Sequence, residues 1–216
     1  METLLVINSS GRVTRSITRR LTERFSQAWQ KQTPAGKIIQ RDVGVNTPAC
    51  VDEGWITAAF AEPARRTPAM HDALRSSETL VEEIIAADAI VLGAPIYNFG
   101  MPAQLKAFFD QIVRVGRTFD FVPGTTEPYR PLLASKPVLV ISSAGDGAMH
   151  PGGALAHLNF LERHLETVFR FIGLNDITFV RVGYEEFQDE RLKHSLAAAE
   201  TALDEFLAGH IESRRR

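Results

Sequence analysis

The 216-residue chain contains one cysteine, no long apolar run and no excess of either charge, and each of these absences excludes a class of protein. Because Cys50 has no second cysteine to pair with inside the chain, the sequence favours a reducing compartment, the cytoplasm. No stretch approaches the roughly 18 apolar residues that a membrane span requires, and the first apolar run, residues 4–7, is too short for a signal peptide. The formal net charge of −2 lacks the basic excess that is typical of nucleic-acid-binding proteins. We therefore expect a cytoplasmic protein with neither a nucleic acid nor a membrane as its partner.

The composition is that of a globular protein. Apolar residues make up 44% of the chain and charged residues 23%, close to the averages of soluble domains, which excludes a disordered, collagen-like or coiled-coil chain. A chain of this length buries roughly 70% of its unfolded surface, enough for a substantial core. We expect residues 1–216 to form a single domain.

Five short apolar segments indicate strands. Residues 4–7, 89–92 and 138–141 are continuous apolar runs, which is typical of strands buried on both faces of a parallel sheet. Two weaker segments, residues 38–42 and 177–182, are predicted to lie nearer the sheet edges.

Helical spacing of apolar residues separates these strands. The clearest example is Leu105, Phe108, Phe109 and Ile112, at positions i, i+3, i+4 and i+7. Strands that alternate with helices predict an α/β fold, a doubly wound parallel sheet with helices on both faces. For five strands we expect the flavodoxin-like order 2-1-3-4-5, whose ligand crevice opens beyond strands one and three.

Three further features are predicted outside the strands. Residues 44–68 and 116–131 are expected to be irregular loops, of a length that usually has a functional role. One long helix, which Gly173 should end, is predicted by Leu158, Leu161, Leu165, Val168 and Ile172.

The loop after the first strand is a candidate phosphate site. It carries Ser10, Thr14, Arg15 and Ser16 and runs directly into a helix. Free backbone N–H groups and the helix dipole favour an anion at such a position, and arginines add charge-assisted contacts. The loop lacks both the Gly-x-Gly-x-x-Gly pattern and a P-loop lysine. The alternative is that Ser10 or Thr14 merely caps the helix, and the loop alone does not decide between the two.

The loop after the third strand is a candidate site for a planar ligand. Ile96, Tyr97, Asn98 and Phe99 place two aromatic side chains around an amide at the carboxyl end of a central strand. Flat ligands are held by apolar walls and a few fixed polar groups, and this position is the switch point of the fold. Tyr97 and Phe99 could instead be ordinary core residues of a turn, but the amide between them favours a binding role.

The residues of this second loop carry a family resemblance. Pro95-Ile96-Tyr97-Asn98-Phe99, followed by Pro102-Ala103-Gln104-Leu105-Lys106, closely resembles the FMN-dependent NADH-azoreductase and NAD(P)H:quinone oxidoreductase family. The resemblance extends to the serine-rich first loop, to residues 116–121, to the loop after the fourth strand and to residues 157–162, in the family's order.

This resemblance implies a function. It implies bound FMN, NADH or NADPH as the source of hydride, and quinones or azo compounds as acceptors in a ping-pong reaction. It also implies a homodimer and makes Ser10, Thr14, Arg15 and Ser16 the phosphate ligands. FMN carries the chemistry, so no residue of the chain is assigned as catalytic.

The resemblance further assigns the third loop to the pyrimidine side of the flavin. The family's Ser-Arg-Gly-Gly maps onto Ser143, Ala144, Gly145 and Asp146, so an arginine is missing and an acid is added. With less positive charge near the ring, we expect a lower flavin potential or a different nicotinamide preference.

Four residues are candidates for the substrate side of the site. In the family, the region of Phe119, Phe121 and Tyr129 helps to cover the flavin at a two-fold dimer interface, although these rings could simply pack under their own loop. His150 could reach the site from the third loop and orient a substrate. We assign no metal, since His157 and His164 lie about 10 Å apart along one predicted helix.

Two other functions fit the same fold. A flavodoxin-type electron carrier is usually smaller and more acidic than this chain. A binding protein without redox chemistry is the second, because a fold does not fix a function.

Overall fold

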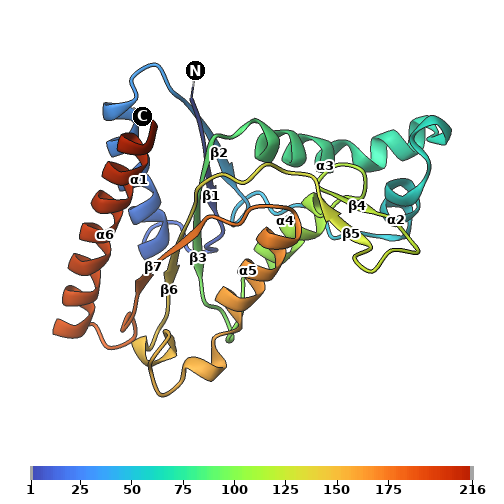
Figure 1. Cartoon of the computed structure of the whole chain (residues 1–216). Coiled ribbons are helices and arrows are strands. Elements are labelled where there is room, and N and C mark those ends of the chain that lie inside the picture. Colours follow the sequence, from blue (N-terminus) through green and yellow to red (C-terminus); the bar gives the residue numbers. More distant parts are fainter. Residues whose placement is uncertain (1, 215–216) are drawn as a thin grey trace.

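The computed structural model describes residues 2–214, and its centre is a five-stranded parallel sheet (Figure 1). The strands lie in the order β2-β1-β3-β6-β7. Their bounds are β1 (Thr3–Asn8), β2 (Lys37–Asp42), β3 (Ala89–Pro95), β6 (Val138–Ser143) and β7 (Ile177–Val182). Numbered within this sheet, the order is 2-1-3-4-5, so the predicted topology is confirmed, as are the two predicted edge strands.

Helices cover both faces of the sheet (Figure 1). One face packs against α1 (Ile17–Gln32) and α6 (Glu190–Arg214), and the other against α3 (Pro68–Ala86), α4 (Ala103–Ile112) and α5 (Phe160–Phe171). Alternate residues of β1 enter the two cores: Leu4 and Val6 face α1 and α6, while Leu5 and Ile7 face the other side. Burial on both faces explains why the central strands read as continuous apolar runs.

Two segments expected to be irregular contain regular structure. Residues 44–68 include α2 (Glu53–Phe60), which begins where the Asp52 carboxylate accepts a hydrogen bond of 2.7 Å from the Trp55 N–H. A 3₁₀ turn, Pro63–Arg65, follows. Residues 116–131 include an antiparallel pair, β4 (Phe119–Phe121) and β5 (Tyr129–Pro131). The loop predictions were therefore wrong at these places, because such short elements depend on long-range packing rather than on local periodicity.

The helix predicted over residues 158–172 is confirmed as α5, but it begins two residues later than expected. A 3₁₀ turn covers Ala156–Leu158, and α5 begins only after Asn159, whose side chain accepts a hydrogen bond of 3.3 Å from the Glu162 N–H. Gly173 follows the helix with φ of +107°, which confirms it as the helix end.

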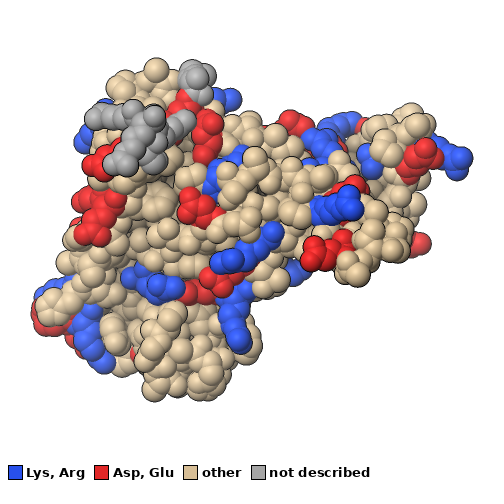
Figure 2. All heavy atoms as spheres, viewed as in Figure 1, with Lys and Arg blue, Asp and Glu red and all other residues tan. Residues whose placement is uncertain are grey.

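The carboxyl ends of the strands meet at one edge of the sheet, at the bottom of Figure 1, and this edge holds the loops singled out by the sequence. Acidic and basic side chains are interspersed over the face shown in Figure 2, in keeping with the small net charge. Within residues 2–214, no helix combines the length and apolarity needed to cross a membrane.

Candidate functional site

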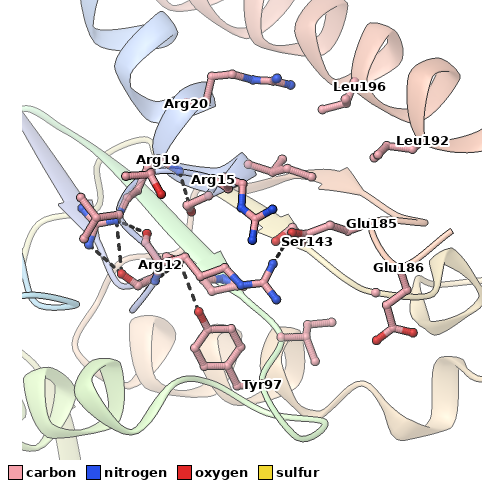
Figure 3. A pocket seen from close by; sticks show the side chains of 18 of the residues that line it. Arg12, Arg15, Arg19, Arg20, Tyr97, Ser143, Glu185, Glu186, Leu192 and Leu196 are labelled. Carbon is pink, nitrogen blue, oxygen red and sulfur yellow. Dashed lines mark hydrogen bonds and ion pairs between the residues drawn. The ribbon is translucent and has the colours of Figure 1, made fainter. Parts of the chain in front are cut away.

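A cavity of about 1,230 Å³ opens at the carboxyl edge of the sheet. The loops after β1, β3, β6 and β7 and the first turns of α1 and α6 form its walls (Figure 3). The structure brings nine predicted site residues together in this lining: Ser10, Thr14, Arg15, Ser16, Ile96, Tyr97, Asn98, Ser143 and Gly145. Three separate loops of the sequence therefore contribute to one space.

The first loop ends in the N-terminus of α1. Ser16 caps the helix, and its Oγ accepts a hydrogen bond of 3.3 Å from the Arg19 N–H. The N–H groups of Ile17 and Thr18 have no carbonyl partner within the helix, because they belong to its first turn. Arg15 is exposed, lines the cavity and forms no ion pair within the described chain. Unpaired donors, a positive helix end and a free guanidinium together form a site for an anion.

Arg19 holds this loop in shape. Its side chain donates to the Ser10 carbonyl at 2.6 Å and to the Arg12 carbonyl at 2.9 Å, and it pairs with the Asp42 carboxylate at the end of β2. The hydrogen bonds from Arg19 lower the pKa of Asp42 despite its partial burial. Sequence analysis missed this role, although the ends of β1 and β2 are neighbours in the predicted sheet and could have suggested the pair.

The two serines of the first loop differ in role. Ser9 is fully buried and donates its hydroxyl to the Gly93 carbonyl at 2.8 Å, so it fastens the loop to β3. Ser10 lines the cavity, with its Oγ 3.3 Å from the Tyr97 Oη and accepting from the Arg12 N–H at 3.2 Å. The first and second loops are thus linked directly through Ser10 and Tyr97.

The second loop is a tight turn. Tyr97 and Gly100 exchange backbone hydrogen bonds of 2.9 and 3.0 Å, and between them Asn98 and Phe99 have φ of 46° and 71°. Positive φ at both central positions defines a type I′ turn, which asparagine tolerates and phenylalanine adopts only rarely. The turn places Asn98 in the lining, whereas the Phe99 side chain is 47% exposed and lies outside it.

If the cavity holds FMN, as the family resemblance implies, Asn98→Gly should weaken FMN binding by about ten-fold without unfolding the turn. Glycine accepts the positive φ of this position, so the substitution removes only the amide that faces the cavity. Fluorescence titration of the apoprotein with FMN measures the change. Asn98→Ala also removes the amide and adds backbone strain, so this variant should bind FMN more weakly still. Unchanged FMN binding in both variants would show that Asn98 is not part of the site.

The third loop contributes two of its four predicted residues. Ser143 and Gly145 line the cavity. Ala144 is buried, at 1% exposure, and its N–H donates to the Val182 carbonyl at 2.9 Å, so this residue extends the sheet instead. Asp146 caps a 3₁₀ turn by accepting from the Ala148 N–H at 2.9 Å and lies outside the lining.

Acidic residues that the sequence analysis did not identify form the wall beside the third loop. Glu185 and Glu186 follow β7 and line the cavity. A Cβ built on Gly145 would lie 2.3 Å from the Glu186 Oε1, so the Glu186 side chain packs directly over the Gly145 backbone. Glu185 reaches across the opening to Arg12, with 2.6 Å between its Oε1 and the arginine Nη1 (Figure 3). The cavity therefore has a basic wall on α1 and an acidic wall after β7.

His150 lies outside this cavity. Its Nδ1 is 3.8 Å from the Glu162 Oε1, behind the third loop, and its Cδ2 lies close to Gly183. Burial alone would raise the pKa of Glu162, but the nearby His150 ring, hydrogen bonds from Arg181 and Asn159 and the charge of Arg181 lower it to about 2. The Glu162 carboxylate therefore stabilises the first turn of α5. His150 lies beside this carboxylate and not in the cavity lining.

Protonation of Glu162 should destabilise the protein in acid. Because its folded pKa of about 2 lies below the ordinary value of 4.5, its contribution is complete above about pH 4.5 and is lost as the pH falls toward 2. The difference corresponds to at most about 3 kcal/mol. Urea unfolding at pH 5 and pH 3 measures it: wild type should lose more stability than Glu162→Gln over this interval. Equal losses would mean that this carboxylate does not titrate as described.

The aromatic residues of β4 and β5 also lie outside the lining. Phe119 and Tyr129 pack against Phe171 at the end of α5, with ring centroids 4.9 and 5.5 Å away from it. Phe121 packs against Tyr129 with the rings tilted and their centroids 5.4 Å apart, and both are about half exposed. Within one chain these rings form a surface cluster rather than a wall of the site. No group of three or more potential metal ligands occurs in residues 2–214.

Comparison with known proteins defines the family. A family model described as the flavodoxin-like fold matches residues 2–207. The FMN-dependent NADH:quinone oxidoreductase of Opitutus terrae is 54% identical over 207 residues, which cover 96% of this chain and 97% of the relative. This chain belongs to the flavodoxin-like FMN-dependent NADH:quinone oxidoreductase family. The family resemblance predicted from the second loop is thereby confirmed.

A second relative supports the family assignment, and two solved structures share the fold. FMN-dependent NADH:quinone oxidoreductase 1 of Pseudomonas fluorescens is 40% identical over 205 residues, covering 94% of this chain and 97% of the relative. The FMN-dependent NADH-azoreductase of Bacillus anthracis str. Ames Ancestor, solved in complex with FMN, matches with a TM-score of 0.81 at 20% identity, over 95% of this chain and 100% of that one. An azoreductase of Bacillus anthracis str. Sterne gives a TM-score of 0.84 at 18% identity, over 96% and 99% of the two chains. At such low identities the two structures establish the fold alone.

Proposed function

We propose that this protein is a cytoplasmic FMN-dependent oxidoreductase that takes hydride from NADH or NADPH and passes it to quinones or azo compounds by a ping-pong reaction. The observation that carries the proposal is the joining of two binding sites in one cavity. An anion site at the start of α1 lies beside a loop that offers an amide and an apolar wall, linked to it through Ser10 and Tyr97. A phosphate ester of a flat ring system combines the same two chemistries.

The residues present fit FMN. The free N–H groups of the first turn of α1, the hydroxyl of Ser16 and the guanidinium of Arg15 would hold the phosphate. Ile96, Tyr97 and Asn98 would contact the ring from one side, and Ser143 and Gly145 would lie along its polar edge. Support also comes from the family, whose named members are FMN-dependent.

The chain's own part in the reaction is binding and orientation. When bound, FMN supplies the ability to accept and return a hydride. The residues that line the cavity would hold the ring and orient it toward a second flat molecule. Reductant and acceptor would take the place of this second molecule in turn, which is the basis for the ping-pong order.

Anaerobic reduction tests the proposal. Protein loaded with FMN should lose its yellow colour within seconds of mixing with NADH and recover it when a quinone is added. Initial rates at several quinone concentrations should give parallel double-reciprocal lines. Slow bleaching by NADH but rapid exchange with a redox partner protein would instead support an electron carrier. Failure of the apoprotein to bind FMN would support a binding protein without redox chemistry.

We also propose that a second copy of the chain covers the exposed aromatic residues. Phe99 and Phe160 are 47% and 56% exposed and adjacent, since the Phe160 N–H donates to the Phe99 carbonyl at 2.9 Å. Phe121 and Tyr129 are 47% and 55% exposed near the other end of α5. A symmetric dimer would bury both groups and bring aromatic side chains near the partner's cavity. Sedimentation velocity at micromolar concentration should show a dimer; a monomer at all concentrations would contradict this.

A further inference from the structure

The cavity continues past the phosphate site into a space between α1 and α6. Figure 3 shows Arg20 on one side of this space and Leu192 and Leu196 on the other. We call this space the α1–α6 arm and define it by Ile17, Arg20, Leu192 and Leu196, all of which line the cavity. The whole cavity, at about 1,230 Å³, exceeds the range of about 300–1,000 Å³ that is usual for a site holding one small molecule. The arm therefore offers room beyond a single bound cofactor.

Arg20 gives the arm an uncommitted positive charge. It lies four residues after Ser16, one helical turn and about 6 Å further along α1. Across the described part of the chain, its side chain forms no ion pair or hydrogen bond, whereas Arg19 and Arg24 on the same helix are paired with Asp42 and Asp204. An exposed guanidinium that faces a cavity without a carboxylate partner is available for an anionic ligand.

The wall opposite Arg20 is apolar. Leu192 is 8% exposed, and Leu196 packs partly buried in the same core. Leucine side chains on one wall and a planar guanidinium on the other can contact both faces of an aromatic base, while the guanidinium also binds a phosphate through two parallel hydrogen bonds. The arm combines the contacts needed by a nucleotide's base and phosphate.

The charge distribution of the cavity favours this end for a second phosphate. A phosphate at the start of α1 would already use Arg15 and the first-turn N–H groups, and another phosphate nearby requires a further cation. The wall after β7 carries Glu186, which forms no ion pair within the described chain and would repel a phosphate, and Glu185, whose charge is already paired with Arg12. Arg20 supplies the cation on the side away from these carboxylates.

We propose that the α1–α6 arm binds the adenylyl group, the phosphate and adenine base, of the reducing dinucleotide while its nicotinamide lies against the flavin. This assignment rests on the proposed function and deepens it, because it names the part of the chain that recognises the reductant. The arm is then a determinant of the KM for the dinucleotide rather than of FMN retention.

Arg20→Gln in the FMN-loaded enzyme tests the arm, with Lys31→Gln as the matched control. Lys31 is exposed in the last turn of the same helix and does not line the cavity, so both substitutions remove one positive charge from α1. We expect Arg20→Gln to raise the KM for NADH and the calorimetric Kd for ADP each by at least about ten-fold, because the charge-assisted contact with the phosphate is lost. The change should appear in KM rather than in kcat, and Lys31→Gln should match wild type. The KM of wild type should also rise with ionic strength more steeply than that of Arg20→Gln.

A second variant, Leu196→Glu, puts a carboxylate opposite Arg20 and should raise both constants further. Wild-type KM for NADH and wild-type Kd for ADP in both Arg20→Gln and Leu196→Glu would overturn the proposal. A preference of the apoprotein for FAD over FMN that Arg20→Gln abolishes and Lys31→Gln does not would also overturn the proposal. In that case the adenylyl group of the resident cofactor, not that of the reductant, would occupy the arm. ADP binding is measured without hydride transfer. A protein that binds ADP through Arg20 but is not reduced by NADH would therefore refute the proposed function and leave the adenylyl site standing.

Discussion

Ser16→Asp yields a protein that no longer retains FMN, with the dissociation constant raised by about three orders of magnitude. The new carboxylate would stand at the cap of α1, where we place the phosphate. Two like charges about 4 Å apart at an effective dielectric constant of about 20 repel by about 4 kcal/mol, which corresponds to roughly a thousand-fold in affinity. Absorbance of the purified protein near 450 nm and titration of the apoprotein with FMN measure the loss.

A second variant separates the effect of the new negative charge on FMN binding from the effect of losing the Ser16 hydroxyl. Aspartate and asparagine both cap helices about as well as serine, so neither Ser16→Asp nor Ser16→Asn should change the unfolding midpoint appreciably. Ser16→Asn lacks the charge and should keep FMN within about ten-fold of the wild-type affinity. If Ser16→Asp binds FMN as tightly as Ser16→Asn does, the phosphate lies elsewhere and the assignment of the first loop is incorrect.

Gly44→Ala is the substitution with the second large expected effect. It should lower both the stability of the protein and its affinity for FMN. A Cβ on Gly44 would lie 2.2 Å from the Ser10 carbonyl oxygen and 2.8 Å from the Arg19 Nη2. The carbonyl belongs to the backbone of the first loop, so the clash cannot be relieved by rotating a side chain. We expect a loss of about 3 kcal/mol in the free energy of unfolding, at the upper end of what overpacking costs. Displacement of Ser10 should also weaken FMN binding.

Urea unfolding of Gly44→Ala and Gly54→Ala provides the comparison. Gly54 is exposed near the start of α2, and a Cβ there would approach nothing closer than the Asp52 Oδ1 at 3.4 Å. Alanine in a helix is favoured over glycine by up to about 1 kcal/mol, so Gly54→Ala should be neutral or stabilising. Equal stability of the two variants would show that the first loop moves aside at no cost and is not rigidly held by its neighbours.

The sheet was predictable because its interior strands carry their own signal. Leu4 to Ile7 must be apolar at every position, since neighbouring residues enter opposite cores. The strand order then placed the first, second and third loops at one edge, and the motif of the second loop identified the family. In contrast, β4 and β5 have three residues each, and Phe119 and Tyr129 pack against Phe171, which is distant in the sequence.

The orientation of individual side chains was less predictable. Ser143, Ala144 and Gly145 are all small residues, and only the hydrogen bond from the Ala144 N–H to Val182 shows that the middle one continues the sheet. The acidic wall depends on backbone shape: Tyr184 and Gln188 have φ of 68° and 51°, and these turns aim the loop between them at the cavity. Neither residue type signals such a conformation from sequence.

The acidic wall follows the edge strand β7, which pairs only with β6 within the described sheet. Insertions or exchanges in residues 183–189 can therefore alter the cavity without shifting the register of β1 or β3, which anchor the phosphate and ring contacts. Substitutions in this connection are therefore expected to be tolerated more often than substitutions in the central strands. Divergence in acceptor preference among family members is accordingly expected to concentrate in the connection between β7 and α6.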